Sequence, residues 1–119
     1  MARRRRPIFA PSEALIQAAC LEHWLTLGVP NSLVAAIPNQ FAHGMAGLTP
    51  GLADLLVLAP GLPVAFIELK RDHKSPLSDA QIEFGKLCDK LGVRYAVAVG
   101  RDEPIRVLEA WGAVKRAAA

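Results

Sequence analysis

Cysteine and long apolar runs are both scarce in this chain of 119 residues. The two cysteines, Cys20 and Cys88, form no Cys-x-x-Cys pair and lie in helical patterns, so we expect buried free thiols rather than a disulfide framework. The longest apolar run, Leu55–Ile67, is interrupted by two prolines and a glycine, which excludes a membrane-spanning helix. The three histidines are too scattered along the chain to predict a zinc site.

The N-terminus is basic but has no apolar segment of signal-peptide length, because Pro7 and Pro11 bracket the residues that follow Met1–Arg6. We therefore expect an intracellular, cytoplasmic protein. The formal net charge of +3 fits a polyanionic partner without requiring one. Arg3–Arg6 are consistent with a phosphate-binding arm and equally with a solvated tail, so the sequence leaves both readings open.

Length and composition predict one domain. With 52% apolar and 21% charged residues, a chain of this length can bury a single core and has no room for a second domain. We assign residues 1–11 to a flexible basic tail, residues 12–112 to the domain and residues 113–119 to a C-terminal tail.

Hydrophobic periodicity and helix caps predict an α/β protein with a mixed sheet and the element order α-β-β-β-α-β-α. The expected elements are a helix from Ser12 to Gly28, strands Ser32–Pro38, Ala53–Ala59 and Val64–Lys70, a helix from Ser78 to Gly92, a strand Tyr95–Val99 and a helix Asp102–Trp111. The second and third strands are largely apolar on both pleat faces, so we expect both faces of each to be buried. The stretch Asn39–Pro50 is expected to be a long functional loop.

The second and third strands are joined by so few residues that we expect them to form an antiparallel hairpin. If the hairpin is centred on Gly61, Ala59 faces Pro63. The same register places Asp54 directly opposite Glu68, with their Cβ atoms roughly 4.5–5.5 Å apart. Two acidic side chains are therefore predicted to meet at the open end of the hairpin.

Like charges that face one another in a buried sheet destabilise it unless a cation lies between them. Asp54 and Glu68 offer the carboxylate oxygens that Mg²⁺ or Mn²⁺ prefers, so one interpretation is a divalent-cation site. The other interpretation is that each acid pairs with a basic side chain near the strand end, such as Lys70 or Arg71. In either case Lys70 projects from the same face of the strand as Glu68.

Both long helices carry polar residues in line with their apolar stripes. Glu13 and Gln17 lie on the same side as the apolar stripe of the first helix. Gln81 leads the stripe of the second helix, which begins where the strand of Glu68 ends. Each also has an ordinary explanation, because Glu13 is an acid in a helix first turn and Gln81 completes a capping box with Ser78. The sequence leaves both explanations open.

These residues resemble a known nuclease signature. Asp54, a hairpin and then Glu68-Leu69-Lys70 are similar to the D…ExK pattern of the PD-(D/E)XK nuclease superfamily. Further positions narrow the resemblance to a stand-alone VRR-NUC domain, namely Glu13 with Gln17, Pro38-Asn39, Gly51, and Leu77-Ser78 followed by Gln81. The resemblance spans about Ser12 to Asp102. Ala53 departs from the pattern, since the family commonly has proline there, but an alanine side chain carries no chemistry.

The resemblance implies a restriction-endonuclease-like PD-(D/E)XK core, a mixed central sheet flanked by helices, that hydrolyses DNA phosphodiester bonds with Mg²⁺ or Mn²⁺. Asp54, Glu68 and the backbone carbonyl of Leu69 would bind the metal, and Glu13 would reach it directly or through a water. Lys70 would orient the attacking water and stabilise charge on the phosphate.

The same resemblance implies that Gln81 positions the water or the scissile phosphate. Single-domain members of this family resemble Holliday-junction resolvases, so it also implies a homodimer that cuts branched DNA, in a prokaryote or a phage. We expect the dimer interface among exposed apolar residues of the first or last helix, such as Trp111.

The proposed site has a basic border. Arg71, His73 and Lys74 follow the strand of Glu68, and Asn39 begins the long loop, so these residues are candidate DNA contacts. A solvated run of charge at a strand end explains the basic residues equally well. The main alternative function is a DNA-binding accessory module with the same fold that does not cleave, and a further one is an unrelated α/β protein in which D…ExK is coincidental.

Overall fold

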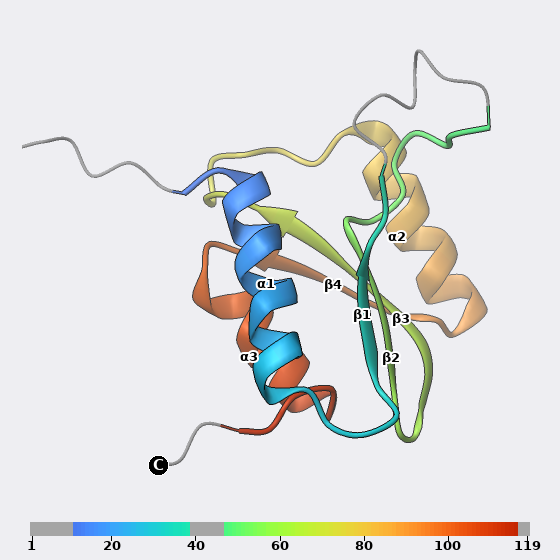
Figure 1. The fold of residues 1–119 in the computed structure, drawn as a ribbon. Helices are drawn as coiled ribbons and strands as arrows, with labels where there is room; N and C mark the ends of the chain where they lie inside the picture. Colours follow the sequence, from blue (N-terminus) through green and yellow to red (C-terminus); the bar gives the residue numbers. More distant parts are fainter. Residues whose placement is uncertain (1–10, 39–46, 117–119) are drawn as a thin grey trace, which may run out of the picture.

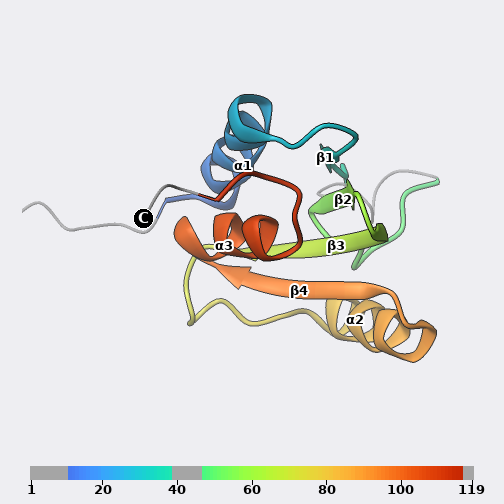
Figure 2. The ribbon, with the colours of Figure 1, turned by 90° about the horizontal axis from the view of Figure 1, so that it is seen from below.

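The protein was analysed as a computed structural model that describes residues 11–38 and 47–116. A four-stranded sheet lies between α1 and α3 on one face and α2 on the other (Figure 1, Figure 2). The elements are α1 (Glu13–Leu27), β1 (Leu33–Ala36), β2 (Leu55–Ala59), β3 (Leu62–Lys70), α2 (Asp79–Leu91), β4 (Arg94–Val99) and α3 (Asp102–Ala110). The predicted α/β class and element order are confirmed. None of the helices in the described ranges is long and apolar enough to cross a membrane.

The sheet is mixed, with the strand order β1-β2-β3-β4. β1 pairs with β2 and β2 with β3 in antiparallel fashion, whereas β3 and β4 are parallel. The parallel pair requires the crossover that α2 supplies. As a result, α2 begins close to the end of β3, and this is the end of the sheet that carries Glu68 and Lys70.

Helix caps set the bounds of α1 and α2 much as the sequence predicts. The hydroxyl of Ser12 accepts a hydrogen bond from the backbone N–H of Leu15 at the start of α1, and Ser78 caps α2 in the same way. α2 ends at Gly92, whose φ of 72° is the left-handed conformation that glycine adopts without strain. The bounds of both helices are therefore determined by capping residues that are close in sequence.

The hairpin register agrees with the prediction at the open end and differs from it at the turn. Leu55 pairs with Ile67, as a hairpin centred on Gly61 requires, but the register shifts near the turn and Ala59 pairs with Leu62 instead of Pro63. Gly61 has a φ of 77°, so the chain turns in two residues, Pro60 followed by a glycine in the left-handed region. The irregularity lies far from the acidic residues and leaves their register intact.

The main core lies between the sheet and the α1/α3 layer. It is built almost entirely from aliphatic side chains, and the largest fully buried ones are Ile16, Leu55, Ile67, Leu69 and Leu108. Burying each such side chain contributes about 1.5–3 kcal/mol. This packing fixes the strands from one side, so that the opposite faces of β3 and β4 are presented to α2.

The α2 face of the sheet is more open than predicted. β3 is buried on both faces from Ile67 to Lys70, but β2 alternates between buried and half-buried residues. The expectation that β2 is buried on both faces is wrong, because α2 covers β3 and β4. There the ring of Phe84 makes edge contacts with Phe66 of β3 and Tyr95 of β4.

The chain beyond α3 packs onto the end of α1. Val114 forms an isolated antiparallel bridge with Gly28, and the N–H of Lys115 donates to the carbonyl of Leu27 at 2.8 Å. Ala113 and Val114 are buried. The packed part of the chain therefore extends beyond residue 112, where the sequence analysis ended the domain.

Candidate metal centre

A hollow of about 350 Å³ opens where β3 ends and α2 begins. It is lined by the first turns of α1, the end of β1 with the residues after it, and the acidic end of the sheet. The lining residues are Glu13, Ala14, Gln17, Ala36, Ile37, Pro38, Asp54, Glu68 and Gln81. Four of the five predicted catalytic residues therefore share one cavity. The fifth, Lys70, is hydrogen-bonded to Gln81 at its edge.

Asp54 immediately precedes β2 and is fixed by two neighbouring strands. Its Oδ2 accepts a hydrogen bond of 2.7 Å from the backbone N–H of Leu69, and its carbonyl accepts one of 2.8 Å from Ile37. The carbonyl of Lys70 faces β4, where it accepts from the N–H of Gly100. Because strand carbonyls alternate in direction, the carbonyl of Leu69 faces the side of Asp54.

Glu68 is almost completely buried, with 1% of its surface exposed. Its Oε1 accepts a hydrogen bond of 2.7 Å from Gln81 Nε2, whereas Oε2 is buried and has no hydrogen-bond partner among the described residues. Burial and, to a smaller extent, the neighbouring Asp54 carboxyl raise the pKa of the Glu68 carboxyl to about 9, although the charge of Lys70 opposes this rise. The site thus contains a buried carboxyl group whose charged form is disfavoured.

Lys70 is 7% exposed and is held by neutral oxygens. Its Nζ donates to the carbonyl of Pro76 at 3.0 Å and to Gln81 Oε1 at 3.2 Å. The alternative in which Asp54 and Glu68 each form an ion pair with Lys70 or Arg71 is therefore not what the structure shows. Neither acid has such a pair within the described ranges.

Gln81 both caps α2 and contacts the charged residues of β3, the two roles between which the sequence did not decide. It is the third residue of α2 and completes a capping box: Ser78 Oγ accepts from its backbone N–H, and the N–H of Ser78 donates to its Oε1 at 2.8 Å. The same side chain contacts both Glu68 and Lys70. One glutamine thus caps the helix and bridges the two charged residues of the strand.

Glu13 lies in the first turn of α1 and faces the hollow from the opposite side. Partial burial raises the pKa of its carboxyl, as does the charge of Asp54, and Lys70 and Arg71 oppose this rise. These influences place Glu13 within the electrostatic field of the centre. Gln17, one turn later, lines the same hollow.

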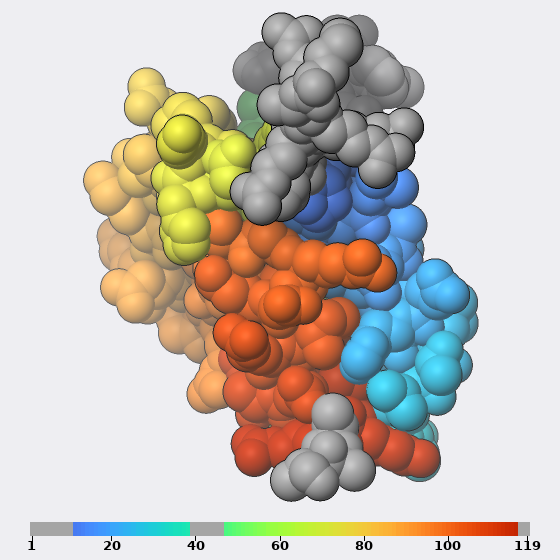
Figure 3. All heavy atoms as spheres, turned by 90° about the vertical axis from the view of Figure 1, so that its left-hand side faces the viewer, coloured from blue at the N-terminus to red at the C-terminus, as the bar shows by residue number. Residues whose placement is uncertain are grey.

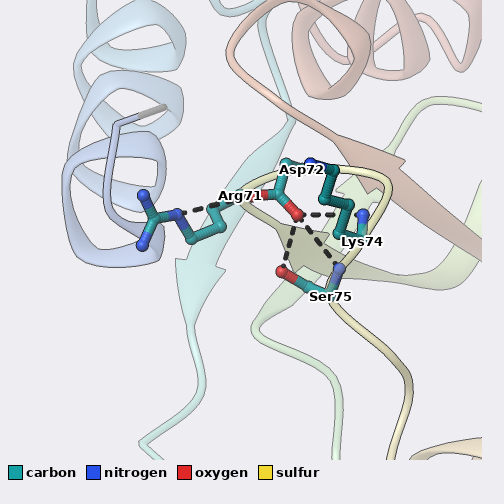
Figure 4. Close-up of polar contacts among 4 residues, drawn as sticks. All are labelled: Arg71, Asp72, Lys74 and Ser75. Carbon is teal, nitrogen blue, oxygen red and sulfur yellow. Dashed lines mark hydrogen bonds and ion pairs between the residues drawn. The ribbon is translucent and has the colours of Figure 1, made fainter. Parts of the chain in front are cut away.

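The loop after β3 is organised by Asp72 (Figure 4). Its Oδ1 accepts hydrogen bonds from the N–H of Lys74 at 2.9 Å and from the N–H and hydroxyl of Ser75 at 3.0 and 3.1 Å, and its Oδ2 lies 3.7 Å from Arg71 Nε. His73 Nε2 lies 3.9 Å from Glu103 Oε2 at the start of α3. In Figure 3 this loop and the start of α3 lie side by side on one face.

None of the candidate DNA contacts in this loop lines the hollow; Arg71, His73 and Lys74 lie beside it, and Asn39 lies outside the described residues. The sequence analysis missed Pro76, whose carbonyl holds Lys70. No local pattern marks a backbone carbonyl for this role. It also missed Asp72, although an aspartate followed by serine three residues later is a recognisable turn signal.

The donor set fits a divalent cation. Asp54 and Glu68 supply carboxylate oxygens, Glu68 Oε2 is buried without a partner, and the Leu69 carbonyl faces the same side. These are the hard oxygen ligands of Mg²⁺ and Mn²⁺, which commonly retain several waters. The described part of the chain has no group of three or more His, Cys, Asp or Glu side chains that could hold an ion. The ligands would therefore be two carboxylates, a carbonyl and water.

The raised pKa of Glu68 predicts how stability depends on pH without divalent cations. The folded protein keeps a proton on Glu68 that the unfolded chain releases above the ordinary carboxyl pKa of 4.5. The folded state thus binds more protons between that pKa and about 9, so this group's contribution to stability falls as pH rises through that window. In chelator, the melting temperature of wild type should decrease between about pH 6 and about pH 8.5 more steeply than that of Glu68→Gln.

Glu68→Gln keeps the shape of the protonated side chain, and Glu83→Gln on the exposed surface of α2 is the control. The control should retain the wild-type slope. Equal slopes for all three proteins would show that Glu68 does not carry this proton.

No family model and no curated protein matches the sequence. Solved structures match the fold, and two of them carry descriptions that name the same domain. One, described as "VRR_NUC domain", has a TM-score of 0.61 at 23% sequence identity and covers 83% of this chain and 96% of that chain. The other, "VRR_NUC domain protein", has a TM-score of 0.70 at 22% identity and covers 84% of this chain and 87% of that chain. The chain therefore has the fold of a VRR_NUC domain, within the restriction-endonuclease-like class.

Proposed function

We propose that this protein is a deoxyribonuclease that hydrolyses DNA phosphodiester bonds with Mg²⁺ or Mn²⁺. The observation that carries this proposal is the buried Glu68 carboxyl on a VRR_NUC fold. This carboxyl lies beside Asp54, and one of its oxygens has no partner in the described parts of the chain. A buried acid whose ionisation is disfavoured is costly to retain unless a ligand compensates it.

Each residue around the hollow has a role in the proposed reaction. Asp54, Glu68 and the carbonyl of Leu69 would hold the cation, and Glu13, on the far wall, would reach it through a water. The bound ion would supply Lewis acidity and a template for in-line attack on phosphorus. Gln81 donates to one oxygen of Glu68, and the other oxygen would bind the cation.

Lys70 is the cation that the protein itself brings to the reaction. Its ammonium is desolvated, so its charge acts on a nearby phosphate more strongly than it would in water. A compact ammonium with three donors can hold a water by one proton and stabilise a phosphate oxygen by another. In the structure its donors go to Pro76 and Gln81, and a substrate phosphate would take one of them.

The DNA backbone would follow the basic loop beside the hollow. Asp72 holds the loop in a turn that carries Arg71, His73 and Lys74 at the end of β3. Contacts to phosphates give affinity without sequence preference, so this border suits a structure-selective enzyme. Asn39 and the arginines Arg3–Arg6 are further proposed contacts outside the described residues.

We further propose that the enzyme acts as a homodimer on branched DNA such as four-way junctions. Each chain has one set of Asp54, Glu68 and Lys70, whereas paired cuts in a symmetric junction require two sites related by a two-fold axis. Exposed apolar side chains on α1, Leu15 and Leu25, and the partly buried Trp111 are candidates for the contact.

One observation favours a second candidate, a DNA-binding accessory module that does not cleave. Lys70 does not line the hollow, and its ammonium is bonded to Pro76 and Gln81 instead. A protein with this arrangement locked in place would bind cation and DNA without catalysis. Cleavage assays separate the two functions.

The test is incubation with labelled single-stranded, duplex, flap and four-way-junction DNA in Mg²⁺, in Mn²⁺ and in chelator. The proposal predicts cleavage in either metal and none in chelator, with paired symmetric cuts in the junction if the dimer acts on branched DNA. Asp54→Asn is the matched inactive control, because it keeps a side chain of the same shape and removes the charge. Tight DNA binding without cleavage in any condition would replace the nuclease with the accessory module.

A further inference from the structure

The side-chain amide of Gln81 joins the N-terminal cap of α2 to the charged residues of β3. Its Oε1 accepts two hydrogen bonds, from the N–H of Ser78 at 2.8 Å and from Lys70 Nζ at 3.2 Å. Its Nε2 donates to Glu68 Oε1 at 2.7 Å. The capping box and the candidate metal centre therefore share one functional group.

The orientation of this amide is determined by its neighbours. Ser78 N–H and the Lys70 ammonium are both donors, so only the amide oxygen can face them. With the oxygen on that side, the amide nitrogen must face Glu68. A flipped amide would place its N–H₂ against two donors and its oxygen against a carboxyl oxygen that would then lack the donor it has here.

This orientation decides which oxygen of Glu68 is left for a ligand. Because Nε2 engages Oε1, Oε2 is the oxygen that has no partner among the residues described in the structure. The same amide oxygen, together with the carbonyl of Pro76, sets the position of the Lys70 ammonium. Hydrogen-bond partners that orient metal ligands typically change metal affinity or activity by about 10–100-fold when they are removed.

We propose that Ser78 is a positioning residue of the catalytic centre, whose backbone N–H and hydroxyl hold Gln81 so that Glu68 and Lys70 keep their working geometry. The inference rests on the proposed nuclease function. An N-cap serine is ordinarily important for helix stability alone. Here Ser78 also holds the Gln81 side chain, which in turn contacts Glu68 and Lys70.

Two substitutions at Ser78 distinguish the contributions of the two hydrogen bonds that form the capping box. Ser78→Ala removes the hydroxyl that accepts from the Gln81 backbone but keeps the N–H that donates to its side chain. Ser78→Pro removes both, and the φ of −70° at Ser78 is one that proline adopts. We expect cleavage at saturating Mn²⁺ to fall modestly in Ser78→Ala and by about 10–100-fold in Ser78→Pro. Ser78→Thr, which keeps both groups, should retain the wild-type rate.

Gly92→Ala is the control for helix stability. It introduces strain at the opposite end of α2, where φ is 72°, and the added Cβ meets nothing within 4 Å. It should therefore lower the melting temperature without changing cleavage or cation binding. If Gly92→Ala reduces the cleavage rate as much as Ser78→Pro does, the cap acts only on stability and the inference is wrong.

If Ser78→Pro does not fold, a double-mutant cycle with Ser78→Ala and Gln81→Ala still tests the inference. If Ser78 acts through Gln81, Ser78→Ala has no further effect on cleavage in a Gln81→Ala background, whereas independent effects would multiply and overturn the inference. A second readout needs no activity: in metal-free protein, the side-chain NH₂ signals of Gln81 in a ¹⁵N-correlated NMR spectrum should shift in Ser78→Ala and not in Gly92→Ala.

The outcomes distinguish this inference from the proposed function. A wild type that cleaves, with Ser78 variants that match Gly92→Ala, overturns only the positioning role. A wild type that never cleaves but is stabilised by Mn²⁺, with the stabilisation weakened in Ser78→Pro alone, supports the positioning role and rejects the nuclease. A wild type with neither cleavage nor stabilisation by Mn²⁺ overturns both.

Discussion

Replacing Lys70 with methionine or alanine should lower metal-dependent DNA cleavage by about 10²–10³-fold, the usual cost of removing one group that stabilises charge in a transition state. The side chain is 7% exposed, so its ammonium acts in a medium where a charge is poorly screened. Lys70→Met keeps most of the apolar stem and removes the charge together with the hydrogen bonds to Pro76 and Gln81. The measurement is the single-turnover rate on the best substrate at saturating Mn²⁺.

Cation binding should survive in both Lys70 variants, because the ammonium is not a ligand. Lys86→Ala provides the control, since Lys86 lies on the exposed surface of α2, 3.6 Å from Glu83. Its cleavage rate should equal that of wild type. If Lys70→Met cleaves as fast as Lys86→Ala does, Lys70 has no part in the chemistry and its contacts with Pro76 and Gln81 are structural.

Mn²⁺ or Mg²⁺ should raise the melting temperature of wild type, and Glu68→Ala should abolish the effect. A ligand at 100 times its dissociation constant adds about 2.7 kcal/mol to the free energy of unfolding. For a domain of this size that corresponds to roughly 10 °C. Glu68→Ala removes the only buried carboxyl oxygen without a partner in the described part of the chain, and with it a proposed metal ligand.

The pH dependence of this stabilisation has a definite sign. Cation binding requires the ionised form of Glu68, so the ion must displace the proton that the raised pKa of about 9 retains. The increase in melting temperature should therefore grow as pH rises toward 9, opposite to the trend in chelator. A melting temperature unmoved by either metal in both proteins would favour a coincidental D…ExK pattern.

The parts of the fold that the sequence predicted are those with local causes. Ser12, Ser78 and Gly92 mark helix ends because caps are set by residues within one turn. Apolar periodicity located the strands, and the short connection between β2 and β3 required a hairpin. The register at the acidic end followed from that hairpin and is confirmed by the pairing of Leu55 with Ile67.

The parts that could not be predicted depend on contacts between distant segments. Ala113 and Val114 are buried only because the chain after α3 packs onto the end of α1. The carbonyl of Pro76 is only six residues from Lys70 in sequence, but its contact depends on the path of the loop between them, which no local pattern specifies. The two-residue turn at Gly61 was missed because the register was counted outward from an assumed centre. For Gln81 the sequence posed a choice between capping and function, and the structure shows that one amide contacts both.

The central claim is that Asp54 and Glu68 form a divalent-cation site. Anomalous scattering from crystals of the protein grown with and without Mn²⁺ tests it most directly. The account predicts an anomalous peak in Mn²⁺ alone, in contact with the Asp54 carboxylate, Glu68 Oε2 and the Leu69 carbonyl, and its loss in Glu68→Ala. No peak at this position at saturating Mn²⁺, with Glu68 Oε2 still lacking a partner, would contradict it.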